Sequence, residues 1–277
     1  TVLHPVLKGI DRLRRDGEHI WVRAMAGEAW DDLVAYAVAN GWGGIENLAL
    51  IPGNVGASAV QNIGAYGVEV ETAIERVEAL TLPEGVPVSF GASECGFGYR
   101  DSLFKSRWPG RHLITAVVFR LQRNPRFNLD YAGVQEHLER IGPPTLANIR
   151  RAVIDLRRSK LPDPAVLGNA GSFFKNPVVD EETLKRLLAE HPALPYFPNG
   201  KGRSKLAAGW LIDQCGWKGK VRGDAAVHDQ QALVLVNRGR ATGADILALS
   251  RSIEQSVEQR FGVVLEREVR VVGGELH

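Results

Sequence analysis

The sequence has few cysteines, a single methionine and no long hydrophobic run. Its two cysteines, Cys95 and Cys215, are too far apart for a metal-binding spacing or a disulfide framework. No apolar stretch approaches the ~20 residues that a membrane-spanning helix needs. Basic residues number 34 and acidic residues 32, so no strong field attracts nucleic acid or an anionic membrane. We therefore expect a cytoplasmic protein with no membrane insertion, no nucleic-acid partner and no metal, and we expect a monomer.

Common nucleotide-binding patterns are also missing, although the chain contains 30 glycines. The glycine-dense stretch 51–67 has neither the Gly-Lys-Ser/Thr of a P-loop nor the spacing of a Rossmann fingerprint. Two interpretations stay open for this stretch. Its backbone N–H groups could form a phosphate cradle, or it could be a glycine-rich turn.

The hydrophobic pattern predicts an α+β chain with two units. Pro162 and Pro164 follow a helical pattern and mark a domain boundary near residue 160. Residues 74–82 and 86–90 alternate apolar and polar side chains around a turn, which predicts a hairpin. The remaining patterns predict strands at 18–26, 113–121, 232–236 and 263–272, and helices at 30–38, 145–160, 180–188, 204–216 and 243–261.

Three polar residues stand in settings that permit chemistry. Arg100 follows aromatic residues and could hold a carboxylate or phosphate in a bidentate fork, but a surface ion pair with Asp101 is more typical. Ser172 lies in a glycine-rich turn and could donate a proton, although a turn serine is the commoner case. Glu268 lies in a run of alternating charges that either faces solvent or presents a carboxylate into a cleft.

Seven runs taken together, in this order, resemble the UDP-N-acetylenolpyruvoylglucosamine reductase family, the flavoenzymes of peptidoglycan precursor synthesis. Several long matching runs in fixed order are far more specific than any single glycine pattern. The match extends over nearly the whole chain. The matching runs are 47–53, 61–67, 97–102, 160–164, 168–177, 205–213 and 265–270.

The resemblance implies reduction of UDP-N-acetylglucosamine enolpyruvate to UDP-N-acetylmuramate, with non-covalent FAD as cofactor and NADPH as co-substrate. Ser172 would donate a proton to the substrate, while Arg100 and Glu268 would stabilise negative charge on its carboxylate. The implied substrate-binding residues are Tyr131, Lys160, Asn176, Tyr196, Lys205, Lys218 and Gln231. The implied FAD contacts are Pro52, Gly53, Gly56, Ala57, Gly64, Tyr66 and Gly67.

The resemblance also predicts the domain organisation. Residues 1–161 correspond to the remaining part of an FAD-binding domain, 162–262 to a UDP-sugar-binding domain, and 263–277 to a strand that returns to the active site. The segment around Tyr196 and the helix expected at Lys205 resemble the family's longer form, in which an extra loop and helical unit close over the substrate.

One expected feature of the family is not found near the start of the sequence. The family's N-terminal lobe carries a G-x-G-S-N loop that holds the FAD diphosphate, and no such loop precedes Trp21. We therefore expect a member without this lobe that binds flavin weakly by itself. The alternative is a chain that retains only UDP-sugar binding, while a flavin oxidase of the same fold is disfavoured by the runs around Arg100, Ser172 and Glu268.

Overall fold

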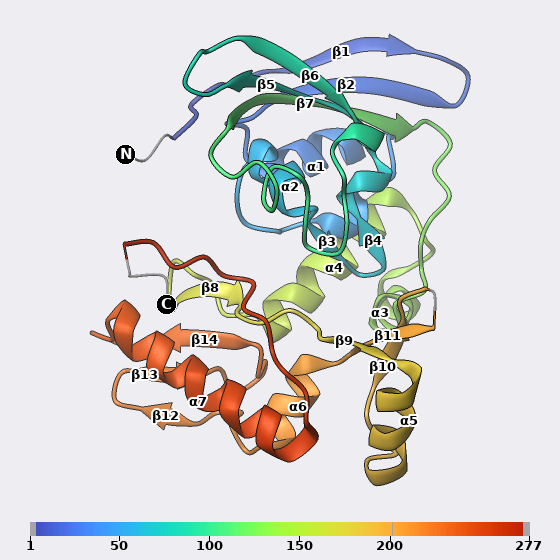
Figure 1. Ribbon diagram of the computed structural model, residues 1–277. Helices are drawn as coiled ribbons and strands as arrows, with labels where there is room; N and C mark the ends of the chain where they lie inside the picture. Colours follow the sequence, from blue (N-terminus) through green and yellow to red (C-terminus); the bar gives the residue numbers. More distant parts are fainter. Residues whose placement is uncertain (1–3, 201, 274–277) are drawn as a thin grey trace. The chain divides into compact units, whose positions relative to one another are not determined.

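The computed structural model describes residues 4–200 and 202–273, which form two compact units (Figure 1). The first unit ends at Arg157 and the second begins at Arg158, within the long helix α4 (Leu146–Lys160). Both units combine antiparallel sheets with helices, so the predicted α+β class is confirmed. Among the described residues, no helix is both long enough and apolar enough to cross a membrane.

The first unit is built on a five-stranded antiparallel sheet with the order β1-β2-β7-β5-β6. Residues 116–119 and Leu121 of the central strand are all fully buried, so most of this strand lies in the core. Helices α1 and α2 lie against one face of this sheet (Figure 1). The elements are β1 (Ile10–Arg15), β2 (His19–Met25), α1 (Trp30–Ala39), α2 (Val55–Gln61), β5 (Ile74–Thr81), β6 (Pro87–Gly91) and β7 (His112–Gln122).

Shorter elements of this unit connect the sheet to the candidate site. Helix α2 lies inside the glycine-dense stretch, where no helix was predicted. A Cβ on Gly56 would lie 2.8 Å from the Cβ of Ala26, so this glycine allows the helix to pack closely on the sheet. The other elements are η1 (Glu46–Leu48), β3 (Gly64–Ala65), β4 (Val68–Glu69), η2 (Val70–Thr72), η3 (Ala92–Glu94) and α3 (Ala132–Ile141).

The second unit has its own core, with a four-stranded sheet ordered β12-β13-β14-β8 and a three-stranded sheet ordered β10-β11-β9. Helix α7 packs on β13 and β14 and begins with a capping box formed by Thr242 and Asp245. The elements are β8 (Gly168–Ser172), β9 (Val178–Asp180), α5 (Glu181–Glu190), β10 (Tyr196–Pro198), β11 (Arg203–Leu206), α6 (Ala208–Gln214), β12 (Val221–Arg222), β13 (Ala225–Val227), β14 (Val234–Asn237) and α7 (Gly243–Phe261).

Two predicted elements of the second unit are wrong. Ser204 does not cap a helix, because it pairs with Pro198 and Val179 as the middle strand of the small sheet, and helix α6 begins only at Ala208. Lys205 therefore lies on a strand. Residues 263–272 do not form a strand, since a single bridge between Phe174 and Arg267 is their only ladder contact among the described residues. Residues 274–277 of the predicted returning strand lie outside the described part of the chain.

Candidate active site and nucleotide pocket

Arg100 occupies a tight turn that depends on a glycine in a distant segment. Its backbone φ is 56°, and its guanidinium donates a hydrogen bond to the carbonyl oxygen of Gly64. A Cβ on Gly64 would lie 2.7 Å from Arg100 Nη1 and 2.9 Å from Glu69 Cγ, so the glycine allows both side chains to pack closely against it. The structure thus brings the segment that contains Arg100 into contact with the glycine-dense stretch 51–67.

Backbone strain gathers around the same segments. The non-glycine residues with left-handed φ in the first unit are Leu50 at 57°, Asn62 at 45°, Tyr66 at 48° and Arg100 at 56°. Such conformations persist only where the surroundings enforce them, and they are concentrated at ligand-binding and catalytic sites. Asn62 is fully buried, and its amide nitrogen donates to the carbonyl oxygen of Gly98 at 2.9 Å. The 61–67 and 97–102 segments are therefore locked together.

Two tyrosines lie against each other in this unit, and the resemblance assigns one to FAD and the other to the substrate. The rings of Tyr66 and Tyr131 meet edge to face, with centroids 4.9 Å apart. Burial raises the pKa of Tyr66 to about 12, and the nearby guanidinium of Arg157 opposes this effect. Desolvation lowers the pKa of Arg157 itself. The structure therefore brings together one predicted FAD contact and one predicted substrate contact.

We expect the Tyr66 phenol to ionise near pH 12 rather than near the usual ~10. Because burial raises the pKa in the folded state, the contribution of the neutral phenol to stability is complete below about pH 10 and is lost as the pH rises towards 12. Subtracting the tyrosinate absorbance titration of Tyr66→Phe from that of the wild type gives this midpoint. Tyr36→Phe serves as the control, and a Tyr66 difference curve centred near pH 10 would contradict the prediction.

Asn47 holds the Tyr66 turn in place and was not predicted as a separate site residue. Its side chain is 1% exposed, and its Nδ2 donates to the carbonyl oxygens of Tyr66 at 2.9 Å and Asn128 at 3.0 Å. Asn128 Nδ2 in turn donates to the Gly67 carbonyl oxygen at 3.1 Å. Among the described residues, no donor reaches the buried Asn47 Oδ1. This oxygen is therefore available to a bound group.

The glycine-dense loop exposes part of its backbone and uses the rest internally. The N–H groups of Val55 and Gly56 donate to the carbonyl oxygens of Glu28 and Ala26 at 2.9 and 3.0 Å. The expectation of consecutive N–H groups exposed for phosphate is therefore wrong at these two residues. Gly53 differs, because it is exposed, has a φ of 112° and has open space where a Cβ would stand. Pro52 and Ala57 are also exposed.

In the second unit, the segments that hold Ser172 and Glu268 meet. Ser172 ends strand β8, follows Gly171 with φ 72°, and is half-buried opposite Val234. The Glu268 backbone N–H donates to the carbonyl oxygen of Phe173 at 2.8 Å. The segments that contain these two residues, far apart in sequence, thus lie side by side. Arg100 belongs to the first unit.

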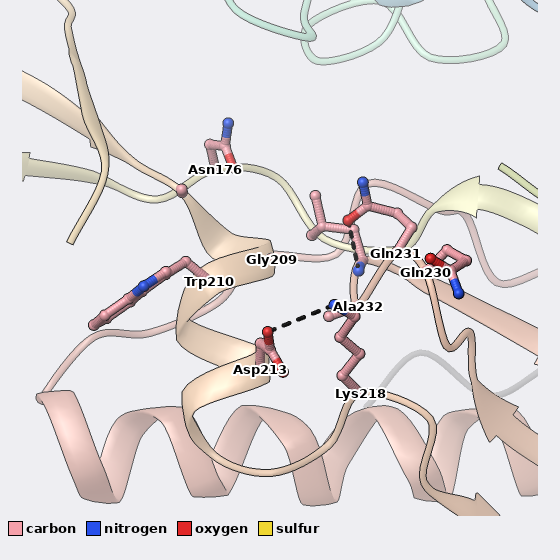
Figure 2. A pocket seen from close by; sticks show the side chains of 10 residues that line it. Asn176, Gly209, Trp210, Asp213, Lys218, Gln230, Gln231 and Ala232 are labelled. Atoms are coloured by element: carbon pink, nitrogen blue, oxygen red, sulfur yellow. Dashed lines mark hydrogen bonds and ion pairs between the residues drawn. The ribbon is translucent and has the colours of Figure 1, made fainter. Parts of the chain in front are cut away.

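A pocket of about 320 Å³ in the second unit contains three of the predicted substrate contacts, Asn176, Lys218 and Gln231 (Figure 2). Lys218 Nζ lies 3.8 Å from a carboxylate oxygen of Asp213. Gln231 Oε1 accepts a hydrogen bond from the Leu233 N–H at 3.3 Å. The other lining residues are Ala207, Gly209, Trp210, Gln230 and Ala232.

Two features shape this pocket. A Cβ on Gly209 would lie 3.2 Å from Gln231 Oε1, so the glycine gives the amide its space. Asn176 Oδ1 accepts from the Ala208 N–H at 3.0 Å and thereby caps helix α6, whose N-cap residue Ala207 has no side-chain acceptor. The pocket combines amide donors and acceptors with a cation, a set that can recognise the edge of a base and a phosphate.

The remaining predicted substrate residues lie elsewhere in the second unit. Lys160 is exposed at the end of α4. Tyr196 is 45% exposed on β10 and pairs with Leu206, while Lys205 on β11 pairs with Phe197. None of these three residues lines the pocket among the described residues.

Comparisons with known proteins assign both parts of the chain. Residues 5–91 match the model of an FAD binding domain, and residues 163–272 match that of the UDP-N-acetylenolpyruvoylglucosamine reductase C-terminal domain. The protein of that name from Chromobacterium violaceum is 55% identical over 270 residues, which cover 96% of this chain and 79% of the relative. The one from Bacteroides fragilis is 50% identical over 98% of this chain and 82% of its own length.

A solved structure agrees with these matches. The crystal structure of UDP-N-acetylenolpyruvylglucosamine reductase from Thermus caldophilus superimposes with a TM-score of 0.61 and 26% identity, covering 90% of this chain and 71% of that one. The FAD-binding domain, together with the match to reductases of this family, makes the chain a flavin-dependent oxidoreductase. The chain belongs to the UDP-N-acetylenolpyruvoylglucosamine reductase family, which confirms the resemblance seen in the sequence.

Proposed function

We propose that this chain reduces UDP-N-acetylglucosamine enolpyruvate to UDP-N-acetylmuramate in peptidoglycan precursor synthesis, with NADPH as the reductant. The observation that carries the proposal is the identity of 50–55% to reductases of this name over nearly the whole chain. The fold agrees with it, because a flavin-binding unit precedes a unit with a polar pocket.

The described residues of the first unit fit a bound flavin. Gly53 offers exposed backbone with open space beside it, and the buried Asn47 Oδ1 is an acceptor that awaits a donor. The Tyr66–Gly67 turn, held by Asn47 and Asn128, adds an aromatic wall. We propose that Pro52, Gly53, Ala57, Tyr66 and Gly67 contact the cofactor directly, whereas Gly56 and Gly64 allow close packing around it.

We propose that the chemistry at the substrate is divided among three residues. When bound, FAD supplies the hydride that it takes from NADPH. Addition of this hydride to the vinyl methylene carbon leaves an electron pair on the next carbon, and the adjacent carboxylate delocalises it. Arg100 donates hydrogen bonds to that carboxylate, and Glu268 supports it in its protonated form. The Ser172 hydroxyl then gives its proton to the carbon and regains one from solvent.

The pocket of the second unit suits the nucleotide end of the substrate. We propose that Gln231 forms hydrogen bonds with the edge of the uracil base, and that Lys218 and Asn176 contact the ribose and diphosphate of the nucleotide. A lysine is a compact charge suited to phosphate. Lys160, Tyr131, Tyr196 and Lys205 are proposed as further contacts along the substrate. The domain limits 1–161, 162–262 and 263–277 are proposed with these roles.

The decisive experiment measures NADPH oxidation and UDP-N-acetylmuramate formation by the purified chain with added FAD. Arg100→Lys keeps the positive charge but loses the two parallel N–H donors of the guanidinium, so we expect the kcat of this variant to fall by roughly 10²- to 10³-fold. The matched control is Arg107→Lys, because Arg107 is an exposed arginine of the same loop, and we expect it to leave kcat unchanged. No product from the wild-type chain with added FAD, or equal rates for the two variants, would contradict the proposal.

The same preparation tests whether the chain binds flavin weakly by itself, and the longer form stays a prediction. The chain spans 79 and 82% of the length of the two relatives above. If the chain binds FAD weakly by itself, the purified protein is colourless and gains flavin absorbance only at high FAD concentration. A stoichiometric yellow protein would contradict that prediction. Calorimetric binding of a UDP-sugar without any flavin binding would favour the alternative of a chain that only binds the sugar nucleotide.

A further inference from the structure

Glu268 is held by a segment that has few backbone contacts of its own. After helix α7 ends at Phe261, residues 263–270 run back beside β8, and we call them the strap. The strap has one bridge to its neighbour, between Arg267 and Phe174, flanked by the bonds from Glu268 N–H to Phe173 and from Lys175 N–H to Glu266, both 2.8 Å long. Beyond Val269, residues 270–273 are exposed. Two backbone bonds, one on either side of the bridge, therefore join the strap to its neighbour.

An ion pair between two side chains adds a further restraint on the strap. Arg267 Nε lies 2.6 Å from Glu254 Oε1, and Arg267 Nη2 lies 2.8 Å from Glu254 Oε2. This is a bidentate fork, the geometry in which arginine and carboxylate bind most strongly and with a fixed orientation. Both side chains are mostly buried, 28% and 24% exposed. Glu254 belongs to the middle of α7, which is anchored in the core through Ile253 and Val257. The strap is therefore fastened to a rigid helix.

Arg267 of the fork directly precedes Glu268 in the sequence, and this position gives the fork a role. Along the strap, Val263 and Leu265 face the core while Val264 and Glu266 face outward, so successive side chains point to opposite sides. Arg267 binds Glu254 of α7, and Glu268 is the next residue along the strap. A second ion pair, between Lys175 and Glu266, ties the strap to the segment after Ser172.

We propose that the Glu254–Arg267 pair is a positioning device that fixes the strap at Glu268, whose backbone N–H bonds to Phe173, the residue that follows Ser172. The inference rests on the proposed function, in which Glu268 supports the substrate carboxylate. Neither Glu254 nor Arg267 touches substrate or cofactor in this scheme, so both are positioning residues.

The kinetic test separates the two halves of the reaction in the chain supplied with FAD. Glu254→Ala and Arg267→Ala leave flavin reduction by NADPH unchanged, because Glu268 has no part in that half. They slow the oxidation of the reduced flavin by the enolpyruvyl substrate by roughly 10- to 100-fold, as expected when a reacting group is displaced by about 1 Å. The charge-swapped double variant, Glu254→Arg with Arg267→Glu, restores part of the rate. The matched control is Glu181→Ala, which removes an exposed ion pair with Lys185.

Hydrogen exchange tests the proposal in a second way that does not require flavin. Hydrogen exchange of the peptide containing Glu268 becomes faster in Glu254→Ala and in the milder Glu254→Gln, while exchange in the rest of α7 is unchanged. Unchanged rates of flavin oxidation by the substrate together with unchanged exchange would overturn the proposal, and so would an equal loss in both half-reactions with a lower melting temperature. If the wild-type chain does not oxidise reduced flavin with this substrate, the proposed function fails, and the exchange experiment still decides whether the pair holds the strap.

Discussion

Ser172→Ala is expected to lower the rate of substrate reduction by about 10²- to 10⁴-fold, the usual contribution of a general acid. The hydroxyl is half-buried at the end of β8, on a turn that Gly171 allows by its φ of 72°. Removing one oxygen at this position leaves the strand pairing with Val234 intact, because that pairing uses only the backbone. The expected result is therefore a catalytic defect in a folded protein. Stopped-flow measurement of each half-reaction provides the test.

The pattern across the two half-reactions identifies the role of the serine. Flavin reduction by NADPH is expected to keep its rate, since no proton is given to the substrate carbon in that half. Ser252→Ala on helix α7 is the matched control, because this hydroxyl only bonds to the backbone of α7 and to Arg222. A Ser172→Ala variant with full reductase activity would show that another group supplies the proton.

Phe174→Ala is expected to reduce the free energy of unfolding of the second unit by about 3–5 kcal/mol. Phe174 is 1% exposed and packs edge to face against Phe173, with centroids 5.3 Å apart. Truncation to alanine leaves a cavity lined by core residues that are held by α6 and α7, so collapse into the space is limited. Urea denaturation followed by circular dichroism measures the total loss, and hydrogen exchange assigns it to the second unit.

Two further variants calibrate this loss. Phe174→Leu keeps most of the apolar volume and is expected to cost less than the alanine variant. Val264→Ala removes methyl groups from a side chain that is 70% exposed, and its effect is expected to stay within about 0.5 kcal/mol. A loss below about 1 kcal/mol for Phe174→Ala would mean that the core around it is loosely packed.

Local patterns predicted the elements whose environment is simple. The hairpin of β5 and β6 follows from alternation around a turn, and helix α5 follows from Asp180, whose carboxylate accepts from the Thr183 N–H at 2.8 Å. Helix α2 was missed because glycine weakens a helix signal, while the close packing on Ala26 that compensates is a tertiary contact. The strap looked like a strand because burial on one side imposes alternation even where no partner strand is present.

The candidate site likewise contains residues that the sequence predicted and contacts that only the structure shows. Arg100, Ser172 and Glu268 were assigned by resemblance, since each residue alone had a more ordinary explanation. The hydrogen bonds of Asn47 span 19 and 81 residues of sequence, so no local pattern could have shown that this amide fixes Tyr66. The Glu254–Arg267 fork joins a helix to a segment without regular structure, and its geometry depends on the tertiary fold.

The contact between Gly64 and Arg100 has a consequence for how this sequence can change in evolution. Any side chain at position 64 would occupy the space of the guanidinium, so the two positions are epistatic although 36 residues separate them. A Cβ at position 64 would also lie 2.9 Å from Glu69 Cγ and 3.1 Å from the Val68 carbonyl oxygen, so replacing Arg100 alone does not make room for it. Selection on the arginine therefore also favours the glycine, independently of any contact between the glycine and a ligand.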